Sequence, residues 1–172
     1  MNVKVLSLLA FLSFSTVFGL AAVEQRPIDL VVVLDTSSSM HGSYKAVTEY
    51  AVGPLLKEFL RLGDTFHLIG FSGVPRTELS RQIEGSGDIE TIIGRVLLMY
   101  PRDPYTDFVS ALEYVRTYLA ELPESRSTIV VIISDGEHAP APGSPYSGIS
   151  PAALNAKIDD STARLKGNGW TF

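Results

Sequence analysis

Two segments of the sequence are almost entirely apolar and rich in β-branched residues, and they limit the folds open to the chain. Residues 28–34 read IDLVVVL, and residues 127–133 read STIVVII. Uninterrupted runs of this kind are typical of strands covered on both faces inside a parallel sheet, because a strand with one wet face alternates apolar and polar residues. We therefore expect both runs to lie inside a mostly parallel sheet.

Shorter patterns place further strands and helices around these two runs. Residues 65–71 predict another strand and residues 76–84 a short edge strand. Apolar residues recur at helical spacing in four other segments. These segments are 43–62 with a break at Gly53-Pro54, 89–97 capped by Asp88, 108–119 ended by Pro123, and 151–167 capped by Ser150. Alternating strands and helices predict an α/β protein, with a mostly parallel central sheet between two helical layers.

The first 22 residues have the order of a secretory signal peptide. A start containing Lys4 is followed by an apolar stretch and then by small residues up to Ala22. The alternative is an N-terminal membrane anchor, since the stretch approaches the roughly 20 residues that a bilayer span needs. Hydroxyl residues interrupt the stretch, which favours cleavage. We expect residues 23–172 to form one domain, with membrane contact only through an uncleaved leader.

Charge and cysteine content exclude several classes of function. The 172 residues hold 14 Lys and Arg against 19 Asp and Glu, a formal net charge of −5, so no basic field attracts nucleic acid. The chain has no cysteine, hence no disulfide, thiolate metal site or cysteine nucleophile. An exported domain without disulfides is typical of a bacterial envelope, so we expect a periplasmic or extracellular location.

Oxygen-bearing side chains follow the two apolar runs. The first run leads into Asp35, Ser37 and Ser39, which alternate along a turn, and the second leads to Asp135. Ligands of parallel α/β sheets bind beyond the carboxyl ends of the strands. A third segment can contribute at the same edge through Thr106, ahead of the predicted helix. Carboxylate and hydroxyl oxygens suit a hard cation such as Mg²⁺.

Given these motifs, the chain resembles von Willebrand factor type A (VWA) domains over about residues 29–172. DLVVVLDTSSSM is similar to the strand and D-x-S-x-S motif of that family, and TIVVIISDGE to its later strand and Asp-Gly turn. The resemblance implies a metal-ion-dependent adhesion site (MIDAS) that binds Mg²⁺, with Mn²⁺ or Ca²⁺ as alternatives. Its implied metal ligands are Asp35, Ser37, Ser39, Thr106 and Asp135.

The resemblance also implies a binding function. In the family, a carboxylate of the ligand often completes the metal shell. The two aspartates, Asp35 and Asp135, would only just neutralise a divalent cation, which then favours one more anionic oxygen. We therefore expect a non-enzymatic adhesion or interaction module that recognises an acidic group of a protein partner.

The sequence departs from the family pattern in two places. The approach to Thr106 is PRDPYT rather than glycine-rich, so Asp103 or Asp107 could compete as a metal ligand. The family continues with two more strands and a final helix, whereas residues 169–172 (GWTF) would only begin the first of those strands. We therefore expect the domain to be incomplete at its C-terminus.

Two other functions stay open. A metal-dependent phosphatase or hydrolase could use Asp35 as a nucleophile, although such a phosphatase typically has a second carboxylate where this chain has Ser37. A structural role in envelope assembly is the other alternative. The three histidines lack the spacing of a zinc site. We expect His67 in the core or at a sheet edge, and His41 and His138 near the rim of the cleft.

Overall fold

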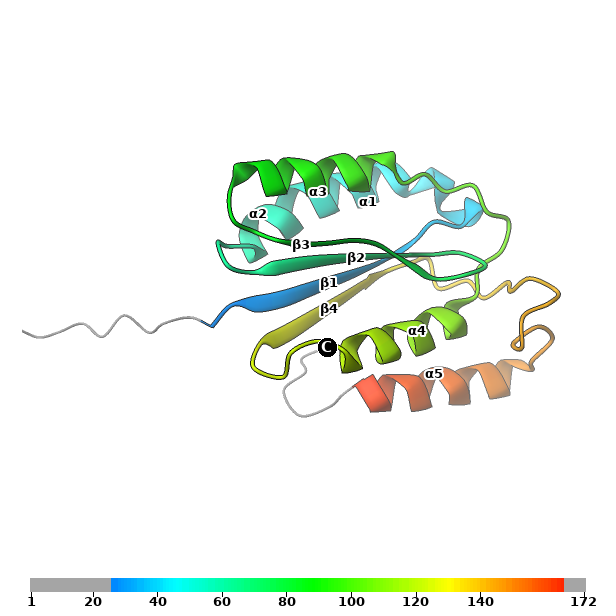
Figure 1. The fold of residues 1–172 in the computed structure, drawn as a ribbon. Helices are drawn as coiled ribbons and strands as arrows, with labels where there is room; N and C mark the ends of the chain where they lie inside the picture. Colours follow the sequence, from blue (N-terminus) through cyan, green and yellow to red (C-terminus); the bar gives the residue numbers. More distant parts are fainter. Residues whose placement is uncertain (1–25, 166–172) are drawn as a thin grey trace, which may run out of the picture.

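The computed structural model describes residues 26–165 and confirms the predicted three-layer α/β fold. The sheet has the strand order β3-β2-β1-β4 (Figure 1). β1 pairs in parallel with β2 and with β4, whereas β2 and β3 are antiparallel. The strands are β1 (Ile28–Asp35), β2 (Thr65–Phe71), β3 (Arg76–Gln82) and β4 (Ser127–Ile133). The expected leader and residues 169–172 lie outside the described residues.

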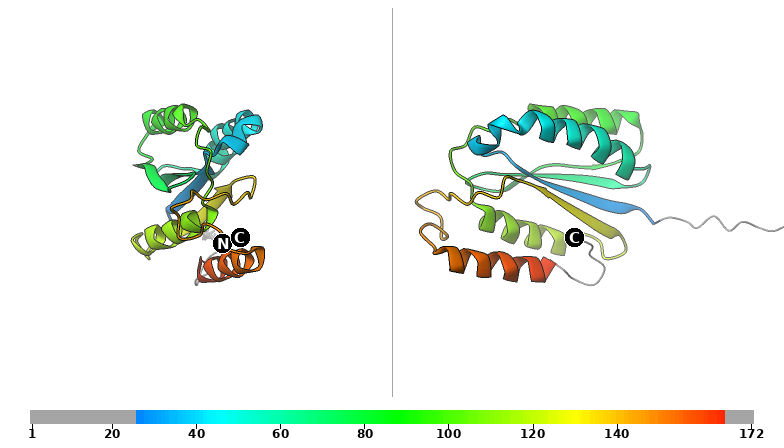
Figure 2. Two further views of the ribbon diagram at one scale, coloured as in Figure 1. Left: turned by 90° about the vertical axis from the view of Figure 1, so that its right-hand side faces the viewer. Right: turned by 180° about the vertical axis from the view of Figure 1, so that it is seen from behind.

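Helices cover both faces of the sheet (Figures 1 and 2). A 3₁₀ turn at Ser38–Gly42 follows β1 and leads into the first helical layer. That layer holds α1 (Tyr44–Tyr50), a π-helical turn (Ala51–Leu55), α2 (Leu56–Phe59) and α3 (Ser86–Leu98). The opposite layer holds α4 (Phe108–Ala120) and α5 (Pro151–Leu165), which pack against each other. No helix within residues 26–165 is long and apolar enough to cross a membrane.

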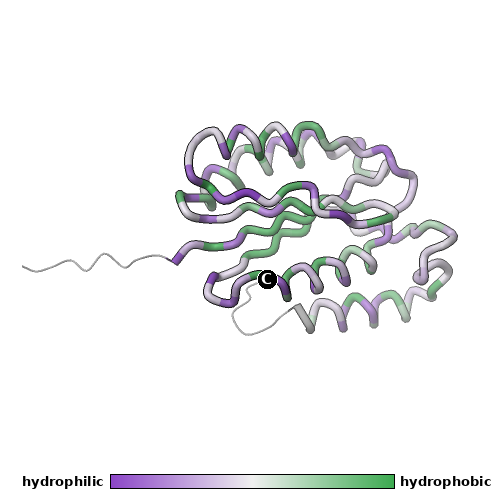
Figure 3. The backbone as a smooth tube through the Cα atoms, in the orientation of Figure 1, coloured by the Kyte–Doolittle hydropathy of each residue, from purple (hydrophilic) through white to green (hydrophobic). Residues whose placement is uncertain are grey.

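The central strand β1 is buried on both faces, as its apolar run predicts. Leu30, Val32 and Leu34 belong to the core under α1 and α3, while Val31 and Val33 belong to the core under α4. All five side chains are at most 1% exposed. The apolar colouring of Figure 3 accordingly concentrates along the middle strands. Strand β1 therefore reaches its carboxyl end as a rigid support for the residues that follow it.

The helix predicted over residues 43–62 is interrupted where the sequence places a proline. Pro54 lies inside the π-helical turn between α1 and α2, and the Leu56 N–H donates to the Ala51 carbonyl five residues back. Proline has no N–H to donate and its ring crowds the preceding turn, so a wider turn is a common way to carry it within a helix. The predicted irregularity at Gly53-Pro54, a kink or a break, is confirmed as this π-helical turn.

Two details of the predicted fold are wrong. β4 is an edge strand that pairs only with β1 among the described residues, and its apolar side chains are half-buried rather than covered on both faces. Asp88 lies within the first turn of α3, where Oδ2 accepts from the Glu84 and Gly85 N–H groups, and Gly85 is the N-cap. Helix α5 spans Pro151–Leu165, and residues 166 and 167 of the predicted helix lie outside the described residues.

A buried polar cluster closes the amino end of the sheet. His67 is 4% exposed, and its Nδ1 lies 2.8 Å from the Tyr118 hydroxyl. Its Nε2 lies 3.6 Å from Asp29 Oδ1, and the same carboxylate oxygen accepts from Arg126 Nε at 2.7 Å. Burial lowers the pKa of His67, although the charge of Asp29 opposes this effect. The expectation that His67 is a core residue is confirmed.

This depressed pKa makes the stability of the fold depend on pH. Folded His67 stays neutral at pH values where the unfolded histidine, with a pKa of about 6.5, takes up a proton. The unfolded state then binds more protons. The contribution of neutral His67 to the free energy of unfolding is therefore fully present above about pH 6.5 and is lost as the pH falls below this value. Urea denaturation should give a smaller free energy of unfolding at about pH 5.5 than at about pH 7.5.

The variant His67→Gln does not titrate and should lose part of this difference. Exposed His41 provides the matched control, because His41→Gln should keep it. An unchanged pH dependence in His67→Gln would contradict the assignment.

Candidate metal centre

Asp35 stands at the carboxyl end of β1 and is fully buried. Its Oδ1 accepts a hydrogen bond of 2.9 Å from the Ser37 N–H, and its Oδ2 accepts one of 2.7 Å from the Ser134 hydroxyl. No ion pair neutralises this carboxylate within residues 26–165. The Ser134 bond joins the loop after β4 to the end of β1, and the two bonds together fix the direction of the carboxylate.

The hydroxyls of Ser37 and Ser39 are hydrogen-bonded to each other across the same turn. Their oxygens lie 2.9 Å apart, Ser37 is 1% exposed, and Ser39 is exposed to solvent. Two neighbouring ligands of an octahedral Mg²⁺, each about 2.0–2.1 Å from the ion, are themselves roughly 2.9 Å apart. The two hydroxyls therefore already have the spacing of adjacent metal ligands, so this part of the predicted ligand set fits the ion.

The loop that contains Thr106 is fastened to both other loops. The Ser38 N–H donates to the Asp103 carbonyl at 2.7 Å. Thr106 is 2% exposed and exchanges two backbone hydrogen bonds of 2.8 Å with Ala139, which follows β4. The three oxygen-bearing segments therefore meet at one edge of the sheet, as the topology predicts.

The two aspartates that could compete with Thr106 both have partners of their own. Asp103 accepts from the Ser72 hydroxyl at 3.0 Å and from the Tyr105 N–H at 2.9 Å. Asp107 is 1% exposed, accepts from the Ser110 N–H at 3.0 Å as the N-cap of α4, and accepts from the Ser144 hydroxyl. Asp107 is therefore the capping residue of this helix, and Thr106 is not.

Asp135 is not in hydrogen-bond contact with the other predicted ligands. Its side chain is exposed, and Oδ1 accepts from the Glu137 N–H at 3.0 Å within its own turn. Within residues 26–165, no three His, Asp or Glu side chains are grouped closely enough to hold a metal ion. The arrangement relies on hydroxyls around one buried carboxylate, and the ligand roles of Thr106 and Asp135 stay predictions.

Sequence reasoning did not assign a role to Ser134, the residue that contacts Asp35. The parallel register pairs Leu34 with Ile133, so the residues that follow them, Asp35 and Ser134, are neighbours at the sheet edge. The sequence carries a weak signal for this contact, a hydroxyl directly after the apolar run, but the register that makes it meaningful comes from the fold.

The histidines near this edge are arranged differently. His41 Nδ1 lies 3.1 Å from the Tyr100 hydroxyl. Both ring nitrogens of His138 are buried and have no hydrogen-bond partner within residues 26–165. No interaction connects either ring to Asp35, so their expected place at the rim of a cleft stays a prediction.

A family model described as the von Willebrand factor type A domain matches residues 30–138. No curated protein matches the chain in a sequence search.

Solved structures share the fold at low sequence identity. Proximal thread matrix protein 1 from the mussel byssus is 22% identical with a TM-score of 0.61, over 86% of this chain and 37% of that one. A von Willebrand factor type A protein from Catenulispora acidiphila is 15% identical with a TM-score of 0.60, over 85% of this chain and 32% of that one. The pilus adhesin SpaC from Lactobacillus rhamnosus GG is 18% identical with a TM-score of 0.50, over 67% and 15%. The chain thus spans between 15% and 37% of the length of these proteins. One structure of the mussel protein has a zinc-occupied MIDAS motif.

The partners of Asp107 give a prediction that separates structural from metal-binding aspartates. Asp107→Ala removes the cap of α4 and the acceptor for Ser144, and should lower the free energy of unfolding by about 1–2 kcal/mol. The measurement is urea denaturation in EDTA, so that bound metal does not contribute. Exposed Glu124→Ala is the control and should change stability by less than about 0.5 kcal/mol. Equal effects of the two substitutions would contradict the capping role.

Proposed function

The chain belongs to the von Willebrand factor type A family, and on that basis we propose that it is a metal-dependent interaction module. In this proposal Asp35, Ser37 and Ser39 hold a divalent cation, Mg²⁺ in the first instance. Thr106 and Asp135 complete the shell directly or through water. The cation then binds a carboxylate of a protein partner.

The spacing of the two serine hydroxyls is the observation that carries this proposal. A separation of 2.9 Å beside the buried carboxylate of Asp35 suits two adjacent ligands of one small ion. A buried carboxylate with no cationic neighbour is unfavourable, and a bound cation would relieve this cost. The zinc-occupied MIDAS of the mussel protein supports a divalent ion in such a motif, and Mn²⁺, Ca²⁺ and Zn²⁺ are alternatives to Mg²⁺.

Charge favours an acidic group as the ligand of the cation. Asp35 and Asp135 carry two negative charges, so a divalent ion bound by both would be only just neutralised and would still favour an anionic oxygen. Without the ion, a chain of net charge −5 would repel an acidic partner. Ser39 is exposed, which leaves an approach from solvent. Partner binding should therefore require the metal.

We propose an exported location for this module. The fold is shared with a byssus matrix protein and with a pilus adhesin, and the apolar N-terminal segment has the order of a signal peptide. These resemblances support a role in adhesion or assembly outside the cytoplasm.

Binding rather than turnover is the proposed activity. The position two residues after Asp35 holds Ser37, where a phosphatase of the aspartyl-nucleophile type would use a carboxylate as its acid. Both oxygens of Asp35 also accept hydrogen bonds in the structure. The test is hydrolysis of a generic phosphate ester or acyl ester in Mg²⁺. Hydrolysis that is lost in Asp35→Ala would favour the alternative function, a metal-dependent phosphatase or hydrolase.

Metal binding is the first test. Titration calorimetry should detect one Mg²⁺ or Mn²⁺ site, and metal at about 100 times its dissociation constant should stabilise the fold by about 2.7 kcal/mol. Ser37→Ala and Ser39→Ala should each weaken binding about tenfold or more, by removing a ligand oxygen. Ser38→Ala is the matched control within the same turn, because Ser38 lies between the two ligands and is exposed. The proposal fails if the three variants bind metal equally well.

Recognition of an acidic group is the second test. A fluorescein-labelled decaglutamate peptide should bind in millimolar Mg²⁺ and lose most of its affinity in EDTA, whereas a decaglutamine peptide should not bind. Asp35→Asn should abolish the effect of Mg²⁺. Binding of decaglutamate that is unchanged by EDTA would overturn the metal-dependent role.

A further inference from the structure

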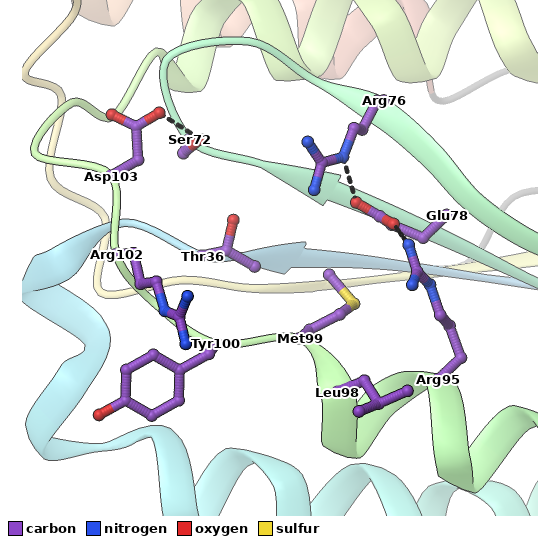
Figure 4. A pocket seen from close by; sticks show the side chains of 10 residues that line it. All are labelled: Thr36, Ser72, Arg76, Glu78, Arg95, Leu98, Met99, Tyr100, Arg102 and Asp103. Carbon is purple, nitrogen blue, oxygen red and sulfur yellow. Dashed lines mark hydrogen bonds and ion pairs between the residues drawn. The ribbon is translucent and has the colours of Figure 1, made fainter.

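A polar pocket of about 340 Å³ lies beside the candidate metal centre. It opens between β3, the end of α3 and the loop that carries Asp103, and Figure 4 shows its lining. Its walls include three arginines, Arg76, Arg95 and Arg102. A concentration of guanidinium groups is unexpected in a chain with a net charge of −5, and nothing in the metal-binding proposal uses it.

The arginines outnumber the carboxylates available to them. Glu78 pairs with both Arg76 and Arg95, and its side chain is only 2% exposed. Burial by itself would raise the pKa of Glu78, but the hydrogen bonds and charges of the two arginines outweigh it and lower the pKa. Glu78 therefore stays ionised and is fully occupied by its two partners.

The other groups leave positive charge unmatched. Arg102 lies 5.2 Å from the centre of the Tyr100 ring and forms no ion pair within residues 26–165. The second carboxylate of the pocket, Asp103, accepts from Ser72 and from the Tyr105 N–H. The Nε of Arg95 is buried and has no hydrogen-bond partner within the described residues. Three guanidinium groups against two carboxylates leave a local charge of +1.

Two lining residues of the pocket, Met99 and Glu78, pack against Gly70 of β2. A Cβ at this position would lie 2.8 Å from Met99 Cε and 3.1 Å from Glu78 Oε1. The absence of a side chain lets both groups pack directly against the strand. Glu78 is thereby held in the position from which it orients Arg76 and Arg95, so the arrangement is fixed by packing and is not a loose surface cluster.

The pocket shares its wall with the candidate metal centre. Thr36 lines the pocket and directly follows Asp35, and its carbonyl accepts from the Arg102 N–H at 3.2 Å. Asp103 also lines the pocket, and its carbonyl accepts from the Ser38 N–H. A ligand that reaches the metal can therefore extend over this wall into the arginines.

We infer that the pocket binds a second carboxylate of the same protein partner, so that the module recognises an acidic segment with two acidic side chains rather than one. The inference rests on the proposed function and specifies its partner. Guanidinium groups bind carboxylates through paired, charge-assisted hydrogen bonds. Arg102 is exposed and has no carboxylate partner within residues 26–165, and the Arg76 side chain is 77% exposed, against 41% for Arg95, so Arg102 and Arg76 are the arginines that a ligand reaches most easily.

The experiment measures the affinity of two fluorescein-labelled peptides by anisotropy in millimolar Mg²⁺. One is decaglutamate, and the other is a glutamine decapeptide with a single glutamate. Arg102→Gln and Arg76→Gln test the pocket, since Arg95 remains to pair with buried Glu78 in either variant. Arg116→Gln removes one positive charge from an exposed position on α4 and is the control. Thermal melting confirms that each variant folds.

We expect Arg102→Gln and Arg76→Gln each to weaken decaglutamate binding about tenfold, the loss of one charge-assisted hydrogen bond or ion pair. Arg116→Gln should change it less than about twofold, because exposed charges beyond a Debye length are screened. The peptide with one glutamate should be unaffected by the pocket variants. In EDTA, the residual decaglutamate binding should still depend on Arg102.

The outcomes distinguish the two proposals. If Mg²⁺ remains necessary but the pocket variants behave like Arg116→Gln, the pocket inference is overturned and the metal-dependent function stands. If the pocket variants weaken binding but EDTA does not, the metal role is overturned while the arginine site stands. Equal losses for both peptides in the pocket variants would overturn the second-carboxylate assignment. Millimolar inorganic phosphate is also added as a competitor. If it displaces decaglutamate equally well from Arg116→Gln and from Arg102→Gln, the second-carboxylate assignment is overturned.

Discussion

The buried carboxylate of Asp35 determines how the rest of this edge of the sheet is arranged. A carboxylate removed from water must be hydrogen-bonded or paired with a cation, because leaving it unsatisfied costs several kcal/mol. Here the Ser37 N–H and the Ser134 hydroxyl supply two hydrogen bonds but no charge. The Ser134 bond holds the loop after β4 against the end of β1, and the two bonds leave an electrostatic requirement that a divalent ion would meet.

At the opposite end of the sheet, a side chain of the protein itself neutralises the buried carboxylate. Asp29, the second residue of β1, is a buried carboxylate, and Arg126, which directly precedes β4, donates to it and also to the Ile28 and Gly63 carbonyls. His67 lies alongside and remains neutral because burial lowers its pKa. One strand thus carries a buried aspartate at each end. The amino-terminal one is neutralised by an arginine, and the carboxyl-terminal one faces hydroxyls.

The candidate metal centre and the arginine pocket share structural supports. The loop between α3 and α4 contacts both, since Asp103 binds the Ser38 N–H through its carbonyl and the Ser72 hydroxyl through its side chain. Two prolines, at positions 101 and 104, restrict the backbone of this loop. The hydrogen bonds of Asp103 and the two prolines thus keep the arginine pocket, which favours anions, next to the candidate metal centre, which holds a carboxylate and hydroxyl groups. This juxtaposition is what the proposed recognition of an acidic segment uses.

The sequence by itself determined those features that depend on neighbouring residues along the chain. The apolar run of β1, the interruption at Pro54 and the alternation of Asp35, Ser37 and Ser39 were all predictable, because each reflects local backbone geometry. Only the tertiary structure decided what lies beside what. It placed β4 at an edge of the described sheet and aligned Ser134 with Asp35. It directed the Asp135 carboxylate to the Glu137 N–H of its own turn. It also brought Arg76, Arg95 and Arg102 from separate segments into one pocket. A periodic pattern states which direction a side chain faces, whereas strand order and register decide which side chain it meets, and these depend on contacts between residues far apart in the sequence.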